Sequence, residues 1–341
     1  MKAAIYNPYL DTLGGGERYT MAVASALTEN GWEVDIEWKD QEIKKSLEER
    51  FGINLAQINF IPDIKRGENY DLCFWVSDGS IPTLRSRKNI LHFQVPFHGV
   101  NGKSLLNKMK LFRIGKIICN SNFTKKVIDQ EYSVESLVIY PPVDTKKIKS
   151  KRKENIILTV GRFSQLKQAK RQDILIEAFK KLYDAGYTDW SFVLAGGVEV
   201  GADEYVKELE KKVGKYPITI IKSPPYADLI NLYGRAKIFW SAAGYGINEQ
   251  KEPEKTEHFG ISAVEAMAAG AIPLLFEAGG HKEIINDGKN GFLWNKVSEL
   301  IAKSKKVINN HSIWASISES AKLSSQQFGY ERFSKEFKEI I

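Results

Sequence analysis

Strand-like and helix-like segments alternate through almost the whole chain of 341 residues. Short apolar runs such as 2–8 and 156–163 end in polar loops, and segments with helical periodicity follow them, such as 15–31 and 171–186. This alternation is typical of a parallel sheet that is flanked by helices. The sequence therefore predicts an α/β architecture and argues against all-helical or all-strand folds.

The chain is too long for one typical hydrophobic core, so we expect two domains. The alternation pauses at 145–155, a charged stretch without apolar periodicity that follows the stiff pair Pro141-Pro142. We interpret this stretch as a linker between two doubly wound domains, residues 1–148 and 149–325. Ligands of such sheets bind at the carboxyl ends of the strands, and two domains that face each other form a cleft.

An apolar run of eighteen residues, 259–276, contains a single charged side chain, Glu265. Its length is near the lower limit for a membrane span, but Glu265, Gly270 and Pro273 argue against one. A carboxylate inside an apolar helix is costly unless it has a partner. Two interpretations stay open: a core helix whose Glu pairs with a Lys or Arg, and a helix whose N-terminus faces a polar ligand.

The second interpretation makes a local prediction. Gly270 is well placed to end the helix, and 271–276 has the pattern of a short buried strand. Another carboxylate, Glu257, precedes Glu265 by eight positions. The two are better suited to accept hydrogen bonds from sugar and ribose hydroxyls than to act as a paired acid and base.

A glycine-rich turn, Gly14-Gly15-Gly16-Glu17, lies between the first expected strand and the first expected helix. Glycines there let a ligand approach the backbone, and a helix N-terminus favours phosphate. The spacing differs from the dinucleotide fingerprint, and an ordinary strand-to-helix turn explains it equally well.

Two cations follow the first strand of the second domain. Arg162 comes directly after the strand, and Lys170 follows a short loop just before the helix. Cations at the carboxyl end of a strand can neutralise a diphosphate leaving group. Lys167 and Arg171 compete with Lys170 for this role.

Two histidines, His92 and His98, lie at the end of a strand in the first domain. His92 is the better candidate for contact with a substrate or for assistance in proton movement, although a lone histidine is often structural. The chain has no Asp-x-Asp pair and no His/Cys cluster with metal-ligand spacing. We therefore expect no metal.

The formal net charge is +7, which favours anionic partners. Leu105, Leu106, Met109 and Phe112 have helical spacing within a basic stretch, 103–126. This stretch fits either a membrane-surface helix or a solvated helix that packs on its own domain. Its basic residues are Lys103, Lys108, Lys110, Arg113, Lys116, Lys125 and Lys126.

Two features bear on location. Cys73 and Cys119 are the only cysteines, too few for a disulfide framework, and the first residues lack a signal-peptide pattern. We expect a cytoplasmic protein, with peripheral attachment to the cytoplasmic membrane face as the alternative.

Together these motifs resemble the retaining glycosyltransferases of family 4, over nearly the whole chain. EHFGISAVEAMAAGAIP carries the family's E-x7-E motif at Glu257 and Glu265. VGRF with KRQDILIEAF resembles the diphosphate-binding Arg and Lys, and GGHKEIINDGKNGFLW resembles the segment after the motif. The GGGE turn matches the glycine-rich acceptor-side loop. The sequence EHFGI is most similar to the corresponding motif of mannosyltransferases that extend lipid-linked oligosaccharides.

The resemblance implies the GT-B fold, which has two Rossmann-like doubly wound domains facing across a cleft, with residues 326–341 crossing back to the first domain. Arg162 and Lys170 would stabilise the departing nucleoside diphosphate, and Glu265 would hold the ribose. Glu257 would hold the sugar. The catalytic set is then Glu257, Arg162, Lys170 and His92. The remaining binding residues, several acting through backbone amides, are Gly15, Gly16, His258, Phe259, Gly260 and Ile261.

The expected partners are a nucleotide-sugar donor and a glycan or lipid-linked acceptor, with an anionic membrane surface at 103–126 and no nucleic acid. GDP-mannose is the expected donor and UDP-sugars are the alternative. No cofactor beyond the donor is expected. Competing hypotheses are another GT-B enzyme, such as a nucleotide-sugar epimerase or a phosphorylase, and a non-catalytic module that binds anionic lipid or nucleic acid.

Overall fold

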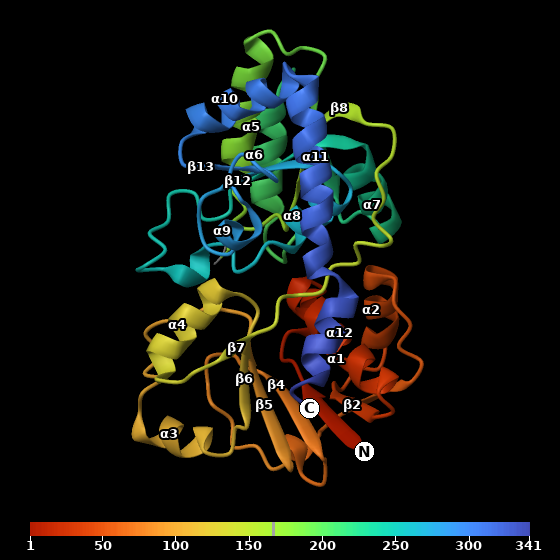
Figure 1. The fold of residues 1–341 in the computed structure, drawn as a ribbon, viewed down its shortest axis with the longest axis vertical. Coiled ribbons are helices and arrows are strands. Elements are labelled where there is room, and N and C mark those ends of the chain that lie inside the picture. Colours follow the sequence, from red (N-terminus) through yellow and green to blue (C-terminus); the bar gives the residue numbers. More distant parts are fainter. Residues whose placement is uncertain (166–167) are drawn as a thin grey trace. The chain divides into compact units, whose positions relative to one another are not determined.

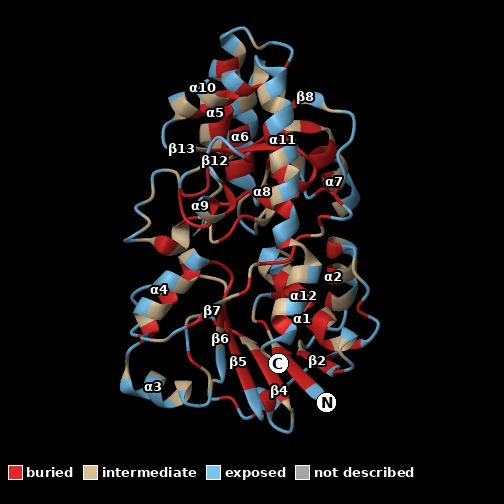
Figure 2. Cartoon of the chain, in the orientation of Figure 1, coloured by how far each residue is buried: buried red, intermediate tan, exposed pale blue. Residues whose placement is uncertain are grey.

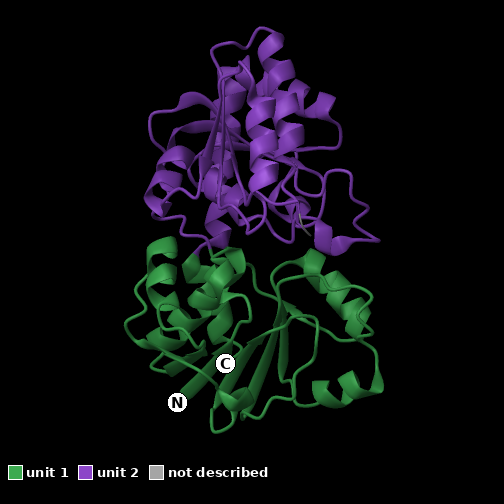
Figure 3. Ribbon diagram, turned by 180° about the vertical axis from the view of Figure 1, so that it is seen from behind, with its two compact units in different colours: residues 1–142, 330–341 green, residues 143–329 purple. Residues whose placement is uncertain are grey.

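The computed structural model describes residues 1–165 and 168–341. The chain forms two compact units, which Figure 3 colours separately. Unit 1 comprises residues 1–142 and 330–341, and unit 2 comprises residues 143–329.

Unit 1 is a parallel sheet of seven strands in the order β3-β2-β1-β4-β5-β6-β7. Strands β1 to β6 follow the doubly wound order of a Rossmann-like fold. The strands are β1 (Lys2–Tyr6), β2 (Glu33–Glu37), β3 (Ile58–Ile61), β4 (Leu72–Val76), β5 (Lys88–Phe93), β6 (Lys116–Cys119) and β7 (Leu137–Val138). The helices of this unit, labelled in Figure 1, are α1 (Gly15–Glu29), α2 (Ile43–Phe51), α3 (Leu105–Leu111), α4 (Asn122–Tyr132) and α12 (Tyr330–Lys338).

Hydrophobic cores cover both faces of this sheet. Alternate residues of a strand point to opposite faces, so Ile90 of β5 joins one core while Leu91 and Phe93 join the other. Helices α1, α2 and α12 supply side chains to the first core, and α4 supplies them to the second. Phe333 and Phe337 of α12 are fully buried in the first core, so the last helix belongs to unit 1.

The described part of unit 2 contains a parallel sheet of six strands in the order β10-β9-β8-β11-β12-β13. The strands are β8 (Glu154–Val160), β9 (Ser191–Gly196), β10 (Ile218–Lys222), β11 (Ala236–Ser241), β12 (Ile272–Phe276) and β13 (Phe292–Trp294). Helix α5 packs against α6 and α10, and α8 packs against α7 and α11. The helices are α5 (Gln172–Asp184), α6 (Asp203–Val213), α7 (Tyr226–Arg235), α8 (Ile261–Ala268), α9 (His281–Ile284), α10 (Val297–Ile308) and α11 (His311–Ser325). Figure 2 shows the buried residues gathered on the sheet and on the helix faces that cover it.

The predicted order of helix, glycine stop and buried strand within 259–276 is confirmed. Helix α8 ends at Ala268, Gly270 adopts the left-handed conformation with φ of 76°, and β12 follows. Within the described residues, no helix is long and apolar enough to cross a membrane.

The unit boundaries fall at 142/143 and 329/330, whereas the sequence placed them at 148/149 and 325/326. The charged stretch that we interpreted as a linker is attached to unit 2. Val143 donates its backbone N–H to the carbonyl of Phe328, at 2.8 Å. The Lys153 ammonium donates to the carbonyls of Ala236 and Ala269, at 2.8 and 2.7 Å. Charge and missing periodicity therefore do not indicate a free linker here.

Candidate functional site

The predicted charged residues of unit 2 gather where its strand order reverses, between β8 and β11. Ligands of doubly wound sheets bind outside the carboxyl ends of the strands at this point. The loop after β8 carries Arg162 and Lys170, and the loop after β11 carries Glu257 and leads into α8. The topology thus brings together residues that are about a hundred positions apart in the sequence.

Lys170 and Glu257 form a direct ion pair, with 2.8 Å between Nζ and Oε2. Both side chains are mostly buried, at 19% and 13% exposure. Gln168 braces the pair, because its Oε1 accepts from the Lys170 ammonium at 3.2 Å and its Nε2 donates to the carbonyl of Thr256 at 2.9 Å. These contacts fix the positions of both charges in a largely desolvated setting.

Glu257 is held in its ionised form. Burial is the largest single influence and would raise the pKa of this carboxyl, but the charge and hydrogen bond of Lys170, together with His281 and His258, bring the pKa down to about 2. The nearby His281 is fully buried, and burial lowers the pKa of its imidazole even though the Glu257 charge acts in the opposite direction. At neutral pH the Glu257 carboxylate is therefore a hydrogen-bond acceptor and not a proton donor.

The turn at Gly279-Gly280 holds the backbone of Glu257 in place. Gly280 donates its backbone N–H to the carbonyl of Glu257 at 2.8 Å. A Cβ added at Gly280 would overlap the backbone of Phe259, so only glycine fits this close approach. The close approach gives a packing reason for the glycines that precede His281.

The start of α8 presents backbone rather than side chains. Phe259 is buried, and the His258 ring is hydrogen-bonded to the Glu254 carbonyl through Nε2 at 3.1 Å. Gly260 caps the helix with φ of 116°, and Ile261 is its first residue. The first N–H groups of a helix lack intrahelical partners, so they can serve an anionic or polar ligand.

Glu265 lies one helical turn and more inside α8 and is buried. The Tyr233 hydroxyl of α7 donates to its Oε2 at 2.8 Å.

Arg162 is exposed and lies 3.8 Å from Glu199, measured between Nη1 and Oε1. Its rival Arg171 is engaged elsewhere, since its guanidinium donates twice to Asp173 and once to the carbonyl of Tyr245. Lys167, the other rival, lies outside the described residues. Among the described candidates, Lys170 is the cation that meets Glu257.

In unit 1 the glycine turn begins α1, and Gly15 is its first residue. Glu17 accepts from the backbone N–H of Gly14 at 2.7 Å, which ties the turn to the helix. A Cβ at Gly16 would overlap the Gln94 side chain, whose Nε2 donates to the Gly16 carbonyl at 3.1 Å. The Gln94 contact accounts for Gly16 without any ligand.

His92 lies in the interior of unit 1, although the sequence favoured it for substrate contact. It alternates with Leu91 and Phe93 on the interior strand β5 and is fully buried, with its ring stacked 4.1 Å from that of Tyr19. Burial lowers the pKa of His92 to about 3. The imidazole is therefore neutral and has no access to solvent in this structure. His98, which was ranked lower, is exposed.

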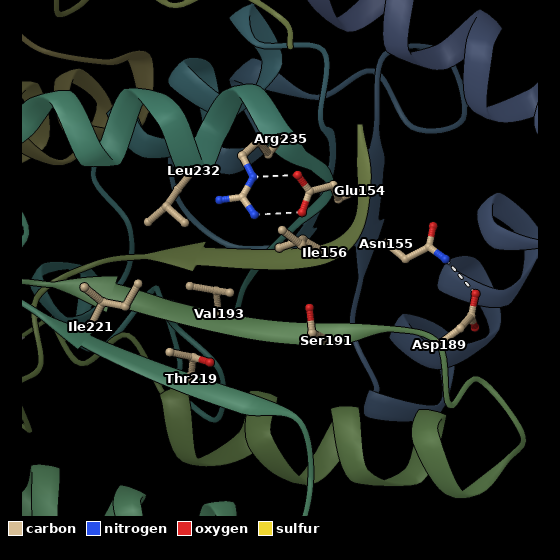
Figure 4. Close-up of a pocket in the computed structure, with 10 residues that line it drawn as sticks. All are labelled: Glu154, Asn155, Ile156, Asp189, Ser191, Val193, Thr219, Ile221, Leu232 and Arg235. Carbon is tan, nitrogen blue, oxygen red and sulfur yellow. Dashed lines mark hydrogen bonds and ion pairs between the residues drawn. The ribbon is translucent and has the colours of Figure 1, made fainter. Parts of the chain in front are cut away.

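A separate hollow of about 420 Å³ lies against the unit 2 sheet, over β8, β9 and β10 (Figure 4). It is lined by residues of these three strands and of α7, and the ion pair between Arg235 and Glu154 closes one side. Glu154 begins β8, whereas Arg162 follows the end of that strand. This hollow is therefore distinct from the charged cluster at the carboxyl ends.

In the parts of the chain that the structure describes, no three His, Cys, Asp or Glu side chains come together in a way that would hold a metal ion. The expectation of a metal-independent site stays a prediction.

Comparison with known proteins identifies the family. Residues 142–324, more than half of the chain, match the family model of "Glycosyl transferases group 1". The chain belongs to this family, and the matched segment contains the whole charged cluster of unit 2. The recognition of a glycosyltransferase from the sequence is thus confirmed.

Two relatives illustrate the range of the family. The chain is 29% identical to an uncharacterized glycosyltransferase of Methanocaldococcus jannaschii over 261 residues, covering 73% of this chain and 67% of the relative. It is 25% identical to the GDP-Man:Man(3)GlcNAc(2)-PP-Dol alpha-1,2-mannosyltransferase of Dictyostelium discoideum, covering 64% of this chain and 45% of that enzyme. The chain thus matches less than half the length of the Dictyostelium enzyme.

Among solved structures, HepE of Anabaena in complex with UDP and glucose superposes with a TM-score of 0.78 at 19% identity, covering 99% of this chain and 98% of that one. This likeness concerns the fold. The predicted fold, two Rossmann-like domains of the GT-B class, is confirmed.

Three residues of the cluster escaped the sequence analysis: Gln168, Tyr233 and His281. Gln168 lies in a loop, and a glutamine gives no signal of its own in a single sequence. Tyr233 contributes through an apolar helix face that looks like ordinary core. His281 lies in the quoted motif segment, where its position directly after Gly279-Gly280 was the available signal.

Proposed function

We propose that the protein is a retaining glycosyltransferase that moves a hexose from a nucleotide sugar to a glycan or lipid-linked acceptor. The observation that carries this proposal is the ion pair between Lys170 and Glu257 beside the start of α8, at the switch point of the unit 2 sheet, with Arg162 on the same loop as Lys170. Two cations, a carboxylate held ionised and a helix N-terminus match a diphosphate joined to a polyhydroxylated ring.

Binding of the donor exchanges partners within the cluster. Lys170 turns from Glu257 to the diphosphate, and Arg162, which is exposed and only loosely paired, joins it. The Glu257 carboxylate then accepts hydrogen bonds from sugar hydroxyls. Glu265, oriented by Tyr233, holds the ribose. In this proposal the ion pair of the donor-free protein keeps both groups in place until the donor replaces it.

The reaction needs no protein nucleophile in this scheme. The bond from the anomeric carbon to the diphosphate oxygen breaks, and the acceptor oxygen bonds to the same face of the sugar. The departing phosphate oxygen takes the acceptor proton. Arg162 and Lys170 stabilise the charge that develops on the diphosphate, which is the role of preorganised cations in a transition state. We propose that no metal ion is required and that unit 1 holds the acceptor.

For the donor we propose GDP-mannose, with UDP-sugars as the alternative. GDP-mannose appears in the name of the Dictyostelium relative, whereas UDP was bound in HepE of Anabaena. The acceptor class is proposed on the same basis, since the name of the Dictyostelium enzyme gives Man(3)GlcNAc(2)-PP-Dol as its acceptor.

The test is a thermal-shift panel of GDP, UDP, ADP and their sugar conjugates without added metal. A ligand at about a hundred times its Kd stabilises the folded state by roughly 2.7 kcal/mol. We expect a clear shift with one nucleotide family, the loss of that shift in Arg162→Ala, and its retention in the control Lys222→Ala. Lys222 is an exposed cation of the same unit, paired with Glu210.

Two outcomes would contradict the proposal. The absence of a shift with every nucleotide would remove the donor site. A shift without release of nucleoside diphosphate in the presence of any glycan or polyprenyl-linked acceptor would favour a binding module.

A further inference from the structure

Unit 1 carries a patch of large apolar side chains that are open to solvent. We call it the α3 patch and define it as Leu105, Leu106, Met109 and Phe112. These side chains are exposed to 76%, 62%, 65% and 96% of their surface. Helix α3 has no buried residue, and Figure 2 shows none along it. An apolar cluster of this kind on a folded protein marks an interaction site.

The helix geometry separates an anchoring side from an exposed side. Leu111 and Ile114 pack against the core beneath the second face of the sheet. At about 100° per residue, the α3 patch occupies a different side of the helix from Leu111. The same geometry places Lys108 and Lys110 on opposite flanks of the patch. The apolar stripe is thus bordered by cations on both sides.

The segment that carries the patch is strongly cationic, although the carboxylate of Glu131 lies beside it and accepts from the backbone N–H groups of Gly99, Val100 and Gly102. No Asp or Glu occurs in residues 79–128, and this segment contains ten Lys and Arg residues. Within the described residues, the ammonium groups of Lys103, Lys108, Lys110 and Lys116 take part in no ion pair. Their charge is available for an external anion.

The charge and the apolar exposure of the α3 patch together indicate which kind of partner binds it. A nucleic acid would satisfy the lysines but would leave the apolar stripe in water, because its affinity comes mainly from phosphate contacts. A second copy of the chain would bring two cationic borders together. A bilayer with anionic headgroups satisfies both parts at once, since it offers an acyl boundary for the stripe and phosphates for the lysines.

We propose that the α3 patch docks unit 1 onto the surface of an anionic lipid bilayer, with Leu105, Leu106, Met109 and Phe112 inserted below the headgroups. Lys103, Lys108, Lys110 and Lys116 contact the lipid phosphates. This inference is independent of the proposed donor chemistry, because it concerns a surface of unit 1 and requires no turnover.

The first test is flotation of the full chain with vesicles of phosphatidylcholine alone and with vesicles that also contain phosphatidylglycerol. We expect binding to the anionic vesicles only. The variant Leu105→Ser/Phe112→Ser should lose at least about tenfold in partitioning, because two large apolar groups leave the boundary region. The control Leu323→Ser removes an isolated leucine of α11 that is 67% exposed, and it should float like the unmodified chain.

The second test separates charge at this place from charge in general. Lys108→Gln/Lys110→Gln should weaken binding several-fold at low salt and reduce its salt dependence. Lys207→Gln/Lys212→Gln changes the net charge equally on α6 and should leave binding unaltered.

Equal binding to neutral and anionic vesicles, or unchanged flotation of Leu105→Ser/Phe112→Ser, would overturn the proposal. Sedimentation that shows a dimer lost in the same variant would assign the patch to self-association and would also overturn it.

Discussion

The two units have the same strand order around their switch points, but the side chains that lie near these points differ. In unit 2 the point is occupied by Arg162, Lys170 and Glu257, two of which already form an ion pair. In unit 1 the turn after β1 carries Gly16, which is hydrogen-bonded to the neutral Gln94, and Glu17, whose carboxylate accepts from the backbone of Gly14. The same scaffold therefore holds a cation–carboxylate pair in one unit and a carboxylate that caps its own helix in the other.

This difference shows that topology supplies the place for a ligand and side chains decide what the place can do. A parallel sheet brings loop residues together in both units. Only in unit 2 are the charges of a diphosphate and a polyhydroxylated ring complemented. The donor chemistry that we propose is accordingly confined to one of two similar folds. The following experiments test this contrast between the units.

The largest effect is expected from the charged cluster. Glu257→Gln keeps the size of the side chain and removes its charge, so kcat/KM for transfer should fall by about two orders of magnitude, as for the loss of one preorganised polar group. Gln94→Ala in unit 1 should change kcat/KM by less than about tenfold, since it removes no charge. Initial rates with a saturating acceptor measure both.

A double variant sharpens this prediction. Lys170→Met and Glu257→Gln alter one ion pair, so their combined loss should be smaller than the product of the single losses. Losses that multiply would mean that the two side chains act independently, and equal losses for Glu257→Gln and Gln94→Ala would remove the contrast between the units.

Glycine replacements compare the rigidity of the two turns. Gly280→Ala brings a methyl group against the backbone of Phe259, which cannot move aside cheaply, so we expect a loss of about 3 kcal/mol in unfolding free energy. Gly16→Ala meets only the end of the Gln94 side chain and should cost about 1 kcal/mol. Urea unfolding of both variants measures the difference, and equal losses would contradict it.

A further prediction concerns acid stability. The pKa of His92 is lowered to about 3 by burial, while an exposed histidine in the unfolded chain titrates near 6.5. Between these values the unfolded chain binds a proton that the folded chain does not, so stability falls as the pH drops, by at most about 1.4 kcal/mol per pH unit. His92→Phe should keep the stack on Tyr19 and flatten this dependence.

Melting temperatures from pH 7 to pH 4 measure that slope. His281 of unit 2 contributes in the same direction, because burial lowers its pKa as well, so part of the slope should remain. Glu257 behaves differently, since its pKa of about 2 means that its stabilising effect is lost only as the pH falls below 4.5 towards 2. An unchanged slope in His92→Phe would show that the imidazole titrates normally.

Much of the fold was accessible from the sequence because its signals are local. The run 259–276 combines apolar residues with one glycine at the point where a helix has to stop, and the structure follows that pattern. Strand β3 gives only a weak sequence signal because it is a short edge strand of four residues. The unit boundaries were displaced because hydrogen bonds from Val143 and Lys153, which bind the charged stretch to unit 2, leave no trace in composition.

The part of the site that could be predicted from the sequence consists of charged residues that lie next to apolar segments. Arg162, Lys170 and Glu257 stood out for that reason, and the structure places Lys170 against Glu257. The expectation that His92 contacts a substrate rested on its place at the end of a strand. A strand pattern does not reveal whether the face of the sheet that carries His92 is covered, and here the core around Tyr19 covers it. The spacing of α3 indicated an amphipathic helix, but only the packing of Leu111 and Ile114 shows that its apolar stripe faces outward.

The position of α12 has a consequence for the order of synthesis. Phe333 and Phe337 complete the core of unit 1, yet the ribosome adds them after every residue of unit 2. The unit that is translated first is therefore the last to obtain its full core, and until then its first helix lacks α12 as a packing partner. A nascent chain of this protein has to keep an unfinished domain from aggregating while a finished one forms behind it.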